Sequence, residues 1–517
     1  MRAPVIRAAM TVFLASFCTM VIELAAGRVL APHVGISLYT WTSIIGVVLA
    51  GISAGAWAGG ILADRHPSPR TLGWLLLGAG LTALAIVPAT SFLAGDDGFL
   101  ESARIATTLL SRVVVLAFFL FFLPSFFLGM ISPVAVKLAV RDLETTGRVV
   151  GKIYAFSTFG SIVGTFVTGF WLVAAFGTRA TLVGTGVVLI TASLILGDLL
   201  GRRGRFYAAA VIIGGIVFAN AQTEPQLPPR HDPVLHSGIG TIHFDESQYY
   251  TIRVERSVRE DTGETINALH LDHLVHSYSD LRDPSYLEYD YLRAFRDVIV
   301  QAARKRANFR LLFIGGGGYT LPRLVVAEYP HAQVDVIEID PEVTRTARRF
   351  FGLPKSPRLR TVNADARWWA MRANGEPYDV VFIDAFNDLS VPYHLTTREA
   401  TLDLVRMLRP DGALVANVID DYARGRFLAS YVKTLESVFG AGSAAVRVET
   451  REDLQSDRST FVVIGSRAMP RIPVMLPREE VRRYVASRDA IVLRDDYAPV
   501  DNMLAPLFRE RFADEQE

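Results

Sequence analysis

Long apolar runs in the first part of the chain constrain its fold more than any other feature. Six stretches are long enough to cross the hydrocarbon core of a membrane, which takes roughly 20 helical residues. They lie at 8–30, 38–63, 71–94, 108–136, 151–176 and 178–200. The first is not a cleavable signal peptide, because its apolar stretch is too long and further spans follow. The sequence therefore predicts a multi-pass helical bundle over residues 1–221.

Lysine and arginine residues set the expected orientation of this bundle. They are frequent before the first span and after the second, fourth and sixth, whereas the loop 31–37 has none and 95–107 has only Arg104. Loops rich in Lys and Arg stay in the cytoplasm. We therefore expect a cytoplasmic N-terminus and an external loop 95–107.

The balance of basic and acidic residues also differs between residues 1–221 and the rest of the chain. Residues 1–221 carry 15 Lys and Arg against 8 Asp and Glu, and the remainder carries 38 against 44. A basic membrane part joined to a mildly acidic soluble part argues against nucleic acid as a partner. Cys18 is the only cysteine. A disulfide within one chain or a cysteine zinc site is therefore excluded, and we expect no metal.

The second half of the chain predicts a soluble α/β domain. A polar, proline-rich linker at 222–233 is followed by β-prone runs at 250–254 and 266–271, which indicate a small antiparallel β unit, and by a helix at 285–304. Strands then alternate with helices, at 311–314, 334–339, 359–363, 378–383 and 413–417. Such alternation indicates a doubly wound, mostly parallel sheet. We place the β unit with its helix at 234–305, a Rossmann-like domain at 306–470, and a C-terminal extension at 471–517.

The residues that follow these strands are the candidates for binding, because ligands bind at the carboxyl ends of parallel strands. Gly315, Gly316, Gly317 and Gly318 follow the first strand and would let backbone N–H groups approach a ligand. Glu338 ends the second strand, at the spacing where an acid meets ribose hydroxyls. Asp365 follows the third strand and Asp384 the fourth. One such acid is usually a helix cap, but three acids beside a glycine run predict a nucleotide site.

The matched stretches Ile314–Gly317, Val336–Asp340, Asn363–Asp365 and Tyr378–Asp384 make residues ~240–470 resemble the spermidine synthase (polyamine aminopropyltransferase) family. With the membrane half included, nearly the whole chain resembles bacterial proteins called fused transporter/spermidine synthases. The resemblance implies a small N-terminal β unit followed by a Rossmann-like domain of the S-adenosylmethionine type. It also implies a cosubstrate, decarboxylated S-adenosylmethionine or S-adenosylmethionine, and polyamine biosynthesis as the activity.

The resemblance assigns roles to individual residues. Glu338 matches the acid that holds the ribose, Asp365 the acid near the adenine, and Asp384 the catalytic aspartate. Tyr289 falls near a tyrosine that lines the amine pocket. From the residues themselves, Asp388, Tyr393 and His394 add polar groups to the loop after Asp384. For Tyr393 and His394, packing within the loop is the alternative.

Three polar groups of the family are changed here. Gly318 stands where the family has an aspartate that meets the cosubstrate's amine, and Tyr250 and His276 stand in place of two glutamines. The leading hypothesis is a membrane-bound transferase that moves an aminopropyl or related group to an amine. An S-adenosylmethionine-dependent methyl or aminocarboxypropyl transferase is the alternative enzyme, favoured by Gly318.

A transporter or sensor with a non-catalytic nucleoside-binding domain is the alternative of another class. Residues 60–65, Gly-Ile-Leu-Ala-Asp-Arg, resemble the loop signature between the second and third helices of major-facilitator transporters. Retention of Asp384 argues against this alternative, because binding alone needs no base. Gly51, Gly55 and Gly59 precede the signature, and their spacing by four suits close helix packing.

The expected partners are a small-molecule amine or similar nucleophile and the lipid bilayer, with a homodimer as an option. The expected location is the bacterial inner (plasma) membrane. A seventh apolar stretch, 206–221, leaves the side of the soluble domain open. The basic residues before it favour crossing, which would put the domain outside. The cytoplasmic origin of an adenosyl cosubstrate favours the inside, and we prefer this second arrangement.

Overall fold

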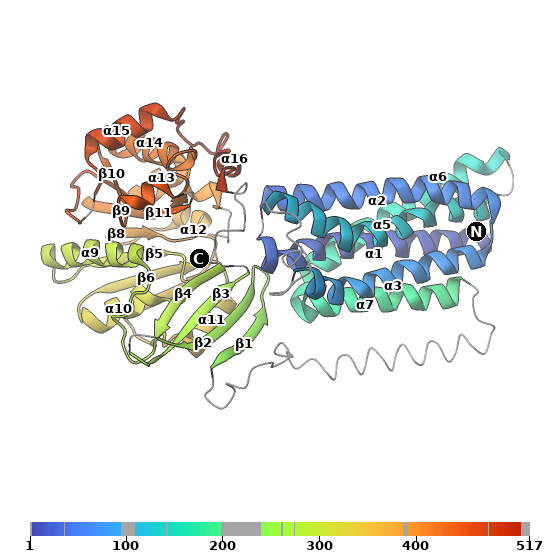
Figure 1. The fold of residues 1–517 in the computed structure, drawn as a ribbon, viewed down its shortest axis with the longest axis horizontal. Coiled ribbons are helices and arrows are strands. Elements are labelled where there is room, and N and C mark those ends of the chain that lie inside the picture. The colour runs from blue at the N-terminus through green and yellow to red at the C-terminus, as the bar shows by residue number, and fades with distance from the viewer. Residues whose placement is uncertain are drawn as a thin grey trace. The chain divides into compact units, whose positions relative to one another are not determined.

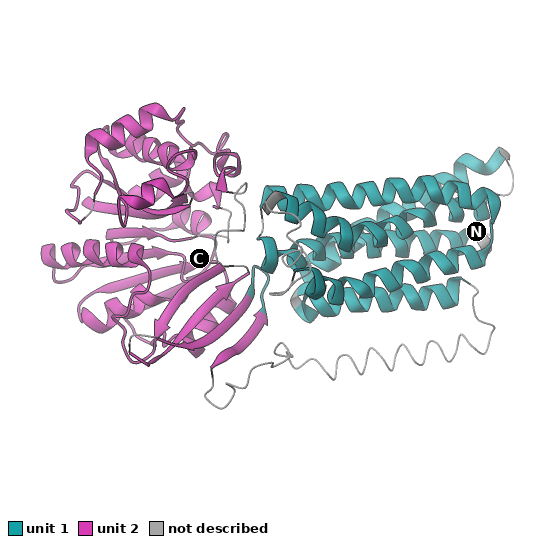
Figure 2. Ribbon diagram, viewed as in Figure 1, with its two compact units in different colours: residues 1–229, 246–251, 512–517 teal, residues 230–245, 252–511 magenta. Residues whose placement is uncertain are grey.

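The computed structural model describes residues 3–35, 37–94, 109–140, 143–197, 239–259, 262–272, 274–385, 391–456, 458–473 and 475–507. The chain divides into two units, shown in Figure 2. Unit 1 comprises residues 1–229, 246–251 and 512–517, and unit 2 comprises residues 230–245 and 252–511. The predicted linker 222–233 and the seventh apolar stretch 206–221 lie outside the described residues.

Unit 1 is a bundle of long apolar helices (Figure 1). They are α1 (Ala3–Val34), α2 (Leu38–Arg65), α3 (Pro69–Ala94), α5 (Leu109–Ala139), α6 (Thr146–Val167) and α7 (Val173–Leu196). A short 3-10 turn (Leu143–Thr145) precedes α6, and one π-helical turn (Thr168–Leu172) joins α6 to α7. Among the described residues, six helices are long and apolar enough to cross a membrane. The six predicted spans are confirmed as helices. The break predicted between 176 and 178 is confirmed by Gly177, whose φ of 74° interrupts α7.

The glycine pattern of α2 lets this helix lie directly against α5. A Cβ atom at Gly51 would lie 2.8 Å from the main-chain oxygen of Phe122, and one at Gly55 would overlap the oxygen of Phe126. Gly59 meets Met130 in the same way. Small residues on one helix face allow such close backbone approach. The predicted packing face of α2 is therefore confirmed.

Unit 2 begins with a four-stranded sheet in the order β1-β2-β3-β4. Its strands are β1 (Gly240–Glu246), β2 (Thr251–Val258), β3 (Thr265–Leu271) and β4 (Leu274–Asp280). The pairs β2–β3 and β3–β4 are antiparallel, as the sequence predicted. Helix α9 (Asp290–Lys305) follows. It is amphipathic and buries Leu292, Phe295 and Ile299 on one face.

A seven-stranded sheet forms the centre of unit 2, in the order β10-β11-β9-β8-β5-β6-β7. The strands are β5 (Arg310–Ile314), β6 (Gln333–Glu338), β7 (Leu359–Asn363), β8 (Tyr378–Ile383), β9 (Leu408–Asp420), β10 (Ala444–Arg447) and β11 (Ser459–Ser466). Strands β5 to β9 are parallel to one another, and β11 pairs antiparallel with both of its neighbours, β9 and β10. The five predicted strands and the mostly parallel sheet are confirmed.

Helices surround this sheet (Figure 1). They are α10 (Thr320–Glu328), α11 (Pro341–Phe350), α12 (Ala366–Arg372), α13 (Arg398–Val405), α14 (Phe427–Phe439), α15 (Arg478–Ser487) and α16 (Val500–Met503). Two 3-10 turns, Tyr393–Leu395 and Glu452–Gln455, complete the described elements. Helix α11 starts where Asp340 caps it, with its side chain accepting from the Glu342 N–H and Pro341 as first residue. Glu338, two residues before this cap, is the last residue of β6.

Candidate active site

The predicted glycine run and acids lie at one edge of the large sheet. Strand β5 leads into Gly315, β6 ends at Glu338, β7 leads to Asp365 and β8 to Asp384. These four strands are neighbours in the order β8-β5-β6-β7 and are all parallel, so their carboxyl ends share an edge (Figure 1). This is the edge at which ligands bind in open α/β sheets.

The glycine loop lies directly on the residue that follows β8. Gly315 has a φ of 96° and Gly317 a φ of 48°, values that favour glycine. A Cβ atom at Gly315 would overlap the main-chain oxygen of Asp384. Only glycine therefore lets the two strand ends come this close.

Glu338 supports the glycine loop. Its side chain is 6% exposed, and burial raises its pKa. Oε2 accepts a hydrogen bond from the Gly316 N–H at 2.7 Å, and Oε1 accepts from the Asp340 N–H at 2.9 Å. Each carboxylate oxygen can accept more than one hydrogen bond. Glu338 thus holds the loop, and its oxygens keep the capacity to accept further hydrogen bonds.

Asp365 has a dual role in the structure. Its Oδ1 caps helix α12 by accepting from the Trp368 N–H at 2.7 Å. Its Oδ2 lies 3.2 Å from Nε2 of His394, so the loop after β8 reaches back to the end of β7. Tyr393 beside it is 55% exposed. Within the described part of the chain, His394 thus contacts the predicted acid Asp365, whereas the Tyr393 side chain has no hydrogen bond to a predicted acid.

Asp384 is held by two side chains that sequence reasoning missed. The hydroxyl of Tyr291 donates to Oδ2 at 3.0 Å, and Nδ2 of Asn417 donates to Oδ1 at 3.0 Å. Burial raises the pKa of Asp384, and these two hydrogen bonds oppose the rise. Tyr291 lies in the predicted helix and Asn417 at the end of a predicted strand. No motif marked either residue.

Tyr289 stands close to this group without touching Asp384. Its hydroxyl donates to the main-chain oxygen of Val275 at 2.9 Å. Its ring stacks on Tyr291, with centroids 5.7 Å apart, and lies 5.6 Å from the ring of Tyr278. Burial raises the pKa of Tyr289, and the charge of Asp384 adds to the rise. An aromatic wall therefore flanks Asp384. Asp388 lies outside the described residues.

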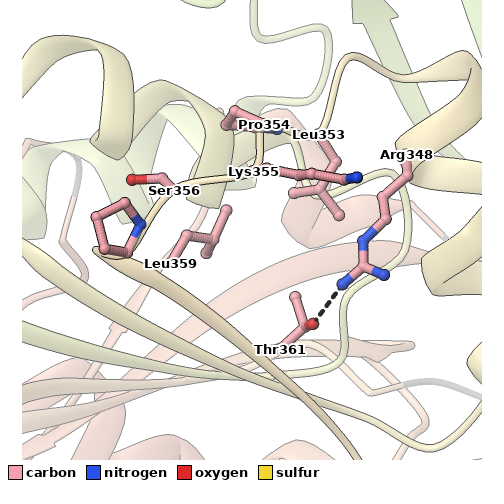
Figure 3. A pocket seen from close by; sticks show the side chains of 8 residues that line it. Arg348, Leu353, Pro354, Lys355, Ser356, Leu359 and Thr361 are labelled. Carbon is pink, nitrogen blue, oxygen red and sulfur yellow. Dashed lines mark hydrogen bonds between the residues drawn. The ribbon is translucent and has the colours of Figure 1, made fainter.

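Figure 3 shows a surface hollow of about 370 Å³. It is lined by Arg348, Leu353, Lys355 and Thr361 among others, and Arg348 donates to the Thr361 hydroxyl at 2.9 Å. None of the predicted site residues that the structure describes lines it. Among the described residues, no group of three His, Cys, Asp or Glu side chains could hold a metal ion.

No family model matches this chain, but individual curated proteins do. A polyamine aminopropyltransferase of Vibrio vulnificus is 37% identical over 133 residues, which cover 25% of this chain and 44% of that protein. Polyamine aminopropyltransferase 1 of Streptomyces coelicolor is 27% identical over 510 residues, which cover 94% of this chain and 88% of that protein. The second match includes the part of the chain that forms the six long apolar helices.

This chain is a relative of the polyamine aminopropyltransferases. The resemblance to this family that the sequence indicated is thereby confirmed. These relatives also support a transferase of this type. Among solved structures, a probable spermidine synthase from Corynebacterium glutamicum matches with a TM-score of 0.42 and 22% identity, over 50% of this chain and 98% of that one.

The structure explains one departure from the polyamine aminopropyltransferase pattern. At Gly318 a Cβ atom would lie 2.7 Å from Cβ of Ser277, whose hydroxyl accepts the Gly318 N–H at 2.9 Å. The family's aspartate therefore has no room at this position unless β4 moves. At another departure, His276, burial lowers the pKa to about 4, so the ring is neutral near pH 7.

Proposed function

We propose that the chain is a membrane-bound aminopropyltransferase, which transfers an aminopropyl group from a decarboxylated S-adenosylmethionine-type donor to an amine. One observation carries the proposal: Asp384, held by Tyr291 and Asn417, lies against the glycine loop at the carboxyl end of β8. The relatives named polyamine aminopropyltransferase support the reaction type.

In this proposal Asp384 removes a proton from the amine that accepts the aminopropyl group. An amine with a pKa near ~10.4 is protonated at neutral pH and has no lone pair for attack on the carbon beside a sulfonium. The carboxylate accepts a proton from the amine, and its charge favours a cationic acceptor. The Tyr291 and Asn417 hydrogen bonds fix the direction of the carboxylate.

The adenosyl part of the donor is assigned to the neighbouring strand ends. Glu338 accepts hydrogen bonds from the ribose hydroxyls. The backbone of the glycine loop lies close to the donor molecule. Asp365 and His394 border the adenine, with the His394 contact holding Asp365 in place. Tyr289 lines the amine side, and Asp388 and Tyr393 are further candidates there. No metal takes part in this proposal.

The first half of the chain anchors the enzyme in a bilayer. Its six long helices expose large apolar side chains, such as Trp57, Trp74 and Phe170. Exposed rings of this size suit a lipid environment. We assign the protein to the bacterial inner membrane with its soluble domain in the cytoplasm.

An S-adenosylmethionine-dependent methyl or aminocarboxypropyl transferase is the second candidate. The crowded surroundings of Gly318 favour it, because a carboxylate side chain that could bind the amine of a decarboxylated donor has no room there unless β4 moves. Calorimetry with S-adenosylmethionine, its decarboxylated form and methylthioadenosine separates the two. Tighter binding of the decarboxylated donor supports the aminopropyl reaction.

The decisive experiment replaces Asp384 by asparagine in the full-length protein. Asp384→Asn keeps the shape but removes the negative charge and the proton acceptor. Loss of general-base assistance typically lowers a rate about 10²–10⁴-fold, and we expect such a fall in single-turnover rate with donor affinity nearly unchanged. If Asp384 only stabilised the fold, the rate per folded molecule would be unchanged, and the proposal would be wrong.

A further inference from the structure

A basic stretch of the chain runs from the last turns of α11 to β7. Residues 345–360 contain six Lys and Arg and no Asp or Glu, although residues 222–517 as a whole carry 38 Lys and Arg against 44 Asp and Glu. Like charges this close together repel one another unless anions offset them. The protein itself supplies partners for only some of these side chains.

Four of the six basic side chains have partners within the protein. Arg345 and Arg360 form ion pairs with acids, and Arg358 donates to two main-chain oxygens. The guanidinium group of Arg349 lies over the ring of Phe350, 5.0 Å from its centroid. The other two basic side chains of the stretch have no acidic partner among the described residues.

These two side chains, Arg348 and Lys355, line the same surface hollow (Figure 3). Arg348 donates to the Thr361 hydroxyl at 2.9 Å, a neutral acceptor, and its other N–H groups stay available. Within the described part of the chain, Lys355 forms no hydrogen bond or ion pair. Figure 3 shows Lys355 extended toward Arg348. The hollow therefore presents two positive charges that the described residues do not neutralise.

The hollow has the size and the mixed walls of a small-molecule site. Its volume of about 370 Å³ falls within the range of ligand pockets, roughly 300–1,000 Å³. Its apolar lining comes from Leu353, Pro354, Pro357 and Leu359, and Ser356 adds a second hydroxyl. None of the described residues that line it is acidic.

The rim that carries Lys355 has a fixed backbone. Pro354 and Pro357 restrict φ on either side of it. The Ser356 hydroxyl accepts from the Arg358 N–H at 3.2 Å, and the Ser356 main-chain oxygen accepts from the Leu359 N–H at 3.1 Å. A rim that is already ordered loses little conformational freedom when a ligand binds, which favours binding.

We infer that this hollow binds a phosphate ester, with the phosphate group held by Arg348 and Lys355 and the carbon part against the apolar wall. The planar guanidinium of an arginine matches two phosphate oxygens, and a lysine adds a point charge. A phosphate monoester carries a charge of about −1.5 to −2 at pH 7, which two cations offset. Only two lining residues are basic, unlike the extended basic surface of a nucleic-acid-binding protein.

The same chemistry is offered by a soluble phosphate ester and by the headgroup of an anionic phospholipid. The described residues proposed for the transfer reaction do not line the hollow. Binding there is therefore measured without the reaction, and the inference stands or falls independently of the proposed function.

The test follows the acetylation of Lys355 by an amine-reactive reagent, read by mass spectrometry, on the full-length protein in phosphatidylcholine nanodiscs. Glycerol 3-phosphate is the soluble probe, and sodium chloride at equal ionic strength is the salt control. At ten times the dissociation constant roughly one site in ten stays free, so acetylation should slow about tenfold. Lys433, whose ammonium donates to the main-chain oxygen of Ala490, is the internal reference and should react at an unchanged rate.

The lipid arm replaces phosphatidylcholine by phosphatidylglycerol and omits the soluble probe. Slower acetylation of Lys355 in this arm alone identifies a lipid headgroup as the ligand, and slowing by glycerol 3-phosphate identifies a soluble ester. Unchanged acetylation of Lys355 in both arms overturns the inference. Equal slowing of Lys355 and Lys433 also overturns it, because charge screening then explains the effect.

Two variants test the role of the arginine. Arg348→Gln should weaken binding of the protecting probe about ten- to hundredfold, the worth of hydrogen bonds to a charged group. Arg349→Gln removes the same charge from a neighbouring position that does not line the hollow, so binding should be unchanged. If Arg348→Gln does not fold, Arg348→Lys, which loses the planar fork, takes its place and should weaken binding. Parent-like binding in the folded Arg348 variant, or equal losses at both positions, overturns the inference.

Discussion

Removal of the Tyr291 hydroxyl should shift the pH dependence of the reaction in a predictable direction. The hydroxyl donates to Asp384 Oδ2 at 3.0 Å and stabilises the carboxylate form. Burial already raises the pKa of Asp384, and this hydrogen bond opposes the rise. In Tyr291→Phe the opposing contribution is lost, so the pKa of Asp384 should rise further.

The magnitude follows from the type of hydrogen bond. A hydrogen bond to a charged group contributes about 1.5–3 kcal/mol, and one pKa unit corresponds to about 1.36 kcal/mol. The acid limb of the kcat/KM profile should therefore move about 1–2 units toward higher pH. Activity requires the ionised carboxylate, so the variant loses most of its rate at low pH and regains it as the pH rises.

The assay is a pH profile of kcat/KM in the full-length protein, because this parameter reports the ionisation of the free enzyme. Tyr289→Phe is the matched control, since its hydroxyl donates to Val275 and not to Asp384. The control should leave the acid limb within a few tenths of a unit. An acid limb that stays in place in Tyr291→Phe, or that moves toward lower pH, would refute the reasoning.

Three further predictions address binding, stability and topology. Glu338→Gln leaves one of the two N–H groups from Gly316 and Asp340 without an acceptor, and methylthioadenosine binding should weaken by about 1.5–3 kcal/mol; equal affinity in calorimetry would contradict this. Asp420 is fully buried, and burial raises its pKa to about 7, so its contribution to stability is present below its ordinary pKa of about 3.9 and is lost as the pH rises through about 7. The thermal midpoint of Asp420→Asn should vary less over this range than that of the parent, and an identical pH dependence would show that Asp420 does not titrate there. In a Cys18→Ser background, Asp97→Cys should react with an impermeant thiol reagent in intact cells, whereas labelling only after permeabilisation would place loop 95–107 inside.

Much of the fold was readable from local patterns. Length and hydropathy predict the helices of unit 1, because a membrane-spanning helix must satisfy its own backbone hydrogen bonds over roughly 20 apolar residues. Alternation of strands and helices predicts the parallel sheet, and the strand predictions at 359–363 and 378–383 match β7 and β8. Since the carboxyl ends of parallel strands share an edge, the chain order alone places Glu338, Asp365 and Asp384 together.

The immediate partners of these acids depended on the tertiary structure. Tyr291 precedes Asp384 by 93 residues and Asn417 follows it by 33. Neither lies in a motif, because a hydrogen bond between distant segments leaves no periodic trace in either one. The same holds for Ser277, which fills the space beside Gly318 where an aspartate would otherwise stand.

The sequence by itself determined which elements form and which acids meet at the sheet edge, because both follow from backbone periodicity and from the direction of each strand. Only the tertiary structure decided how Asp384 is held, since its proton affinity depends on burial and on donors from α9 and β9 that come together when the sheet is assembled. It likewise decided the orientation of the Asn417 amide, whose Oδ1 has no hydrogen-bond partner among the described residues, because the NH₂ end must face the carboxylate of Asp384.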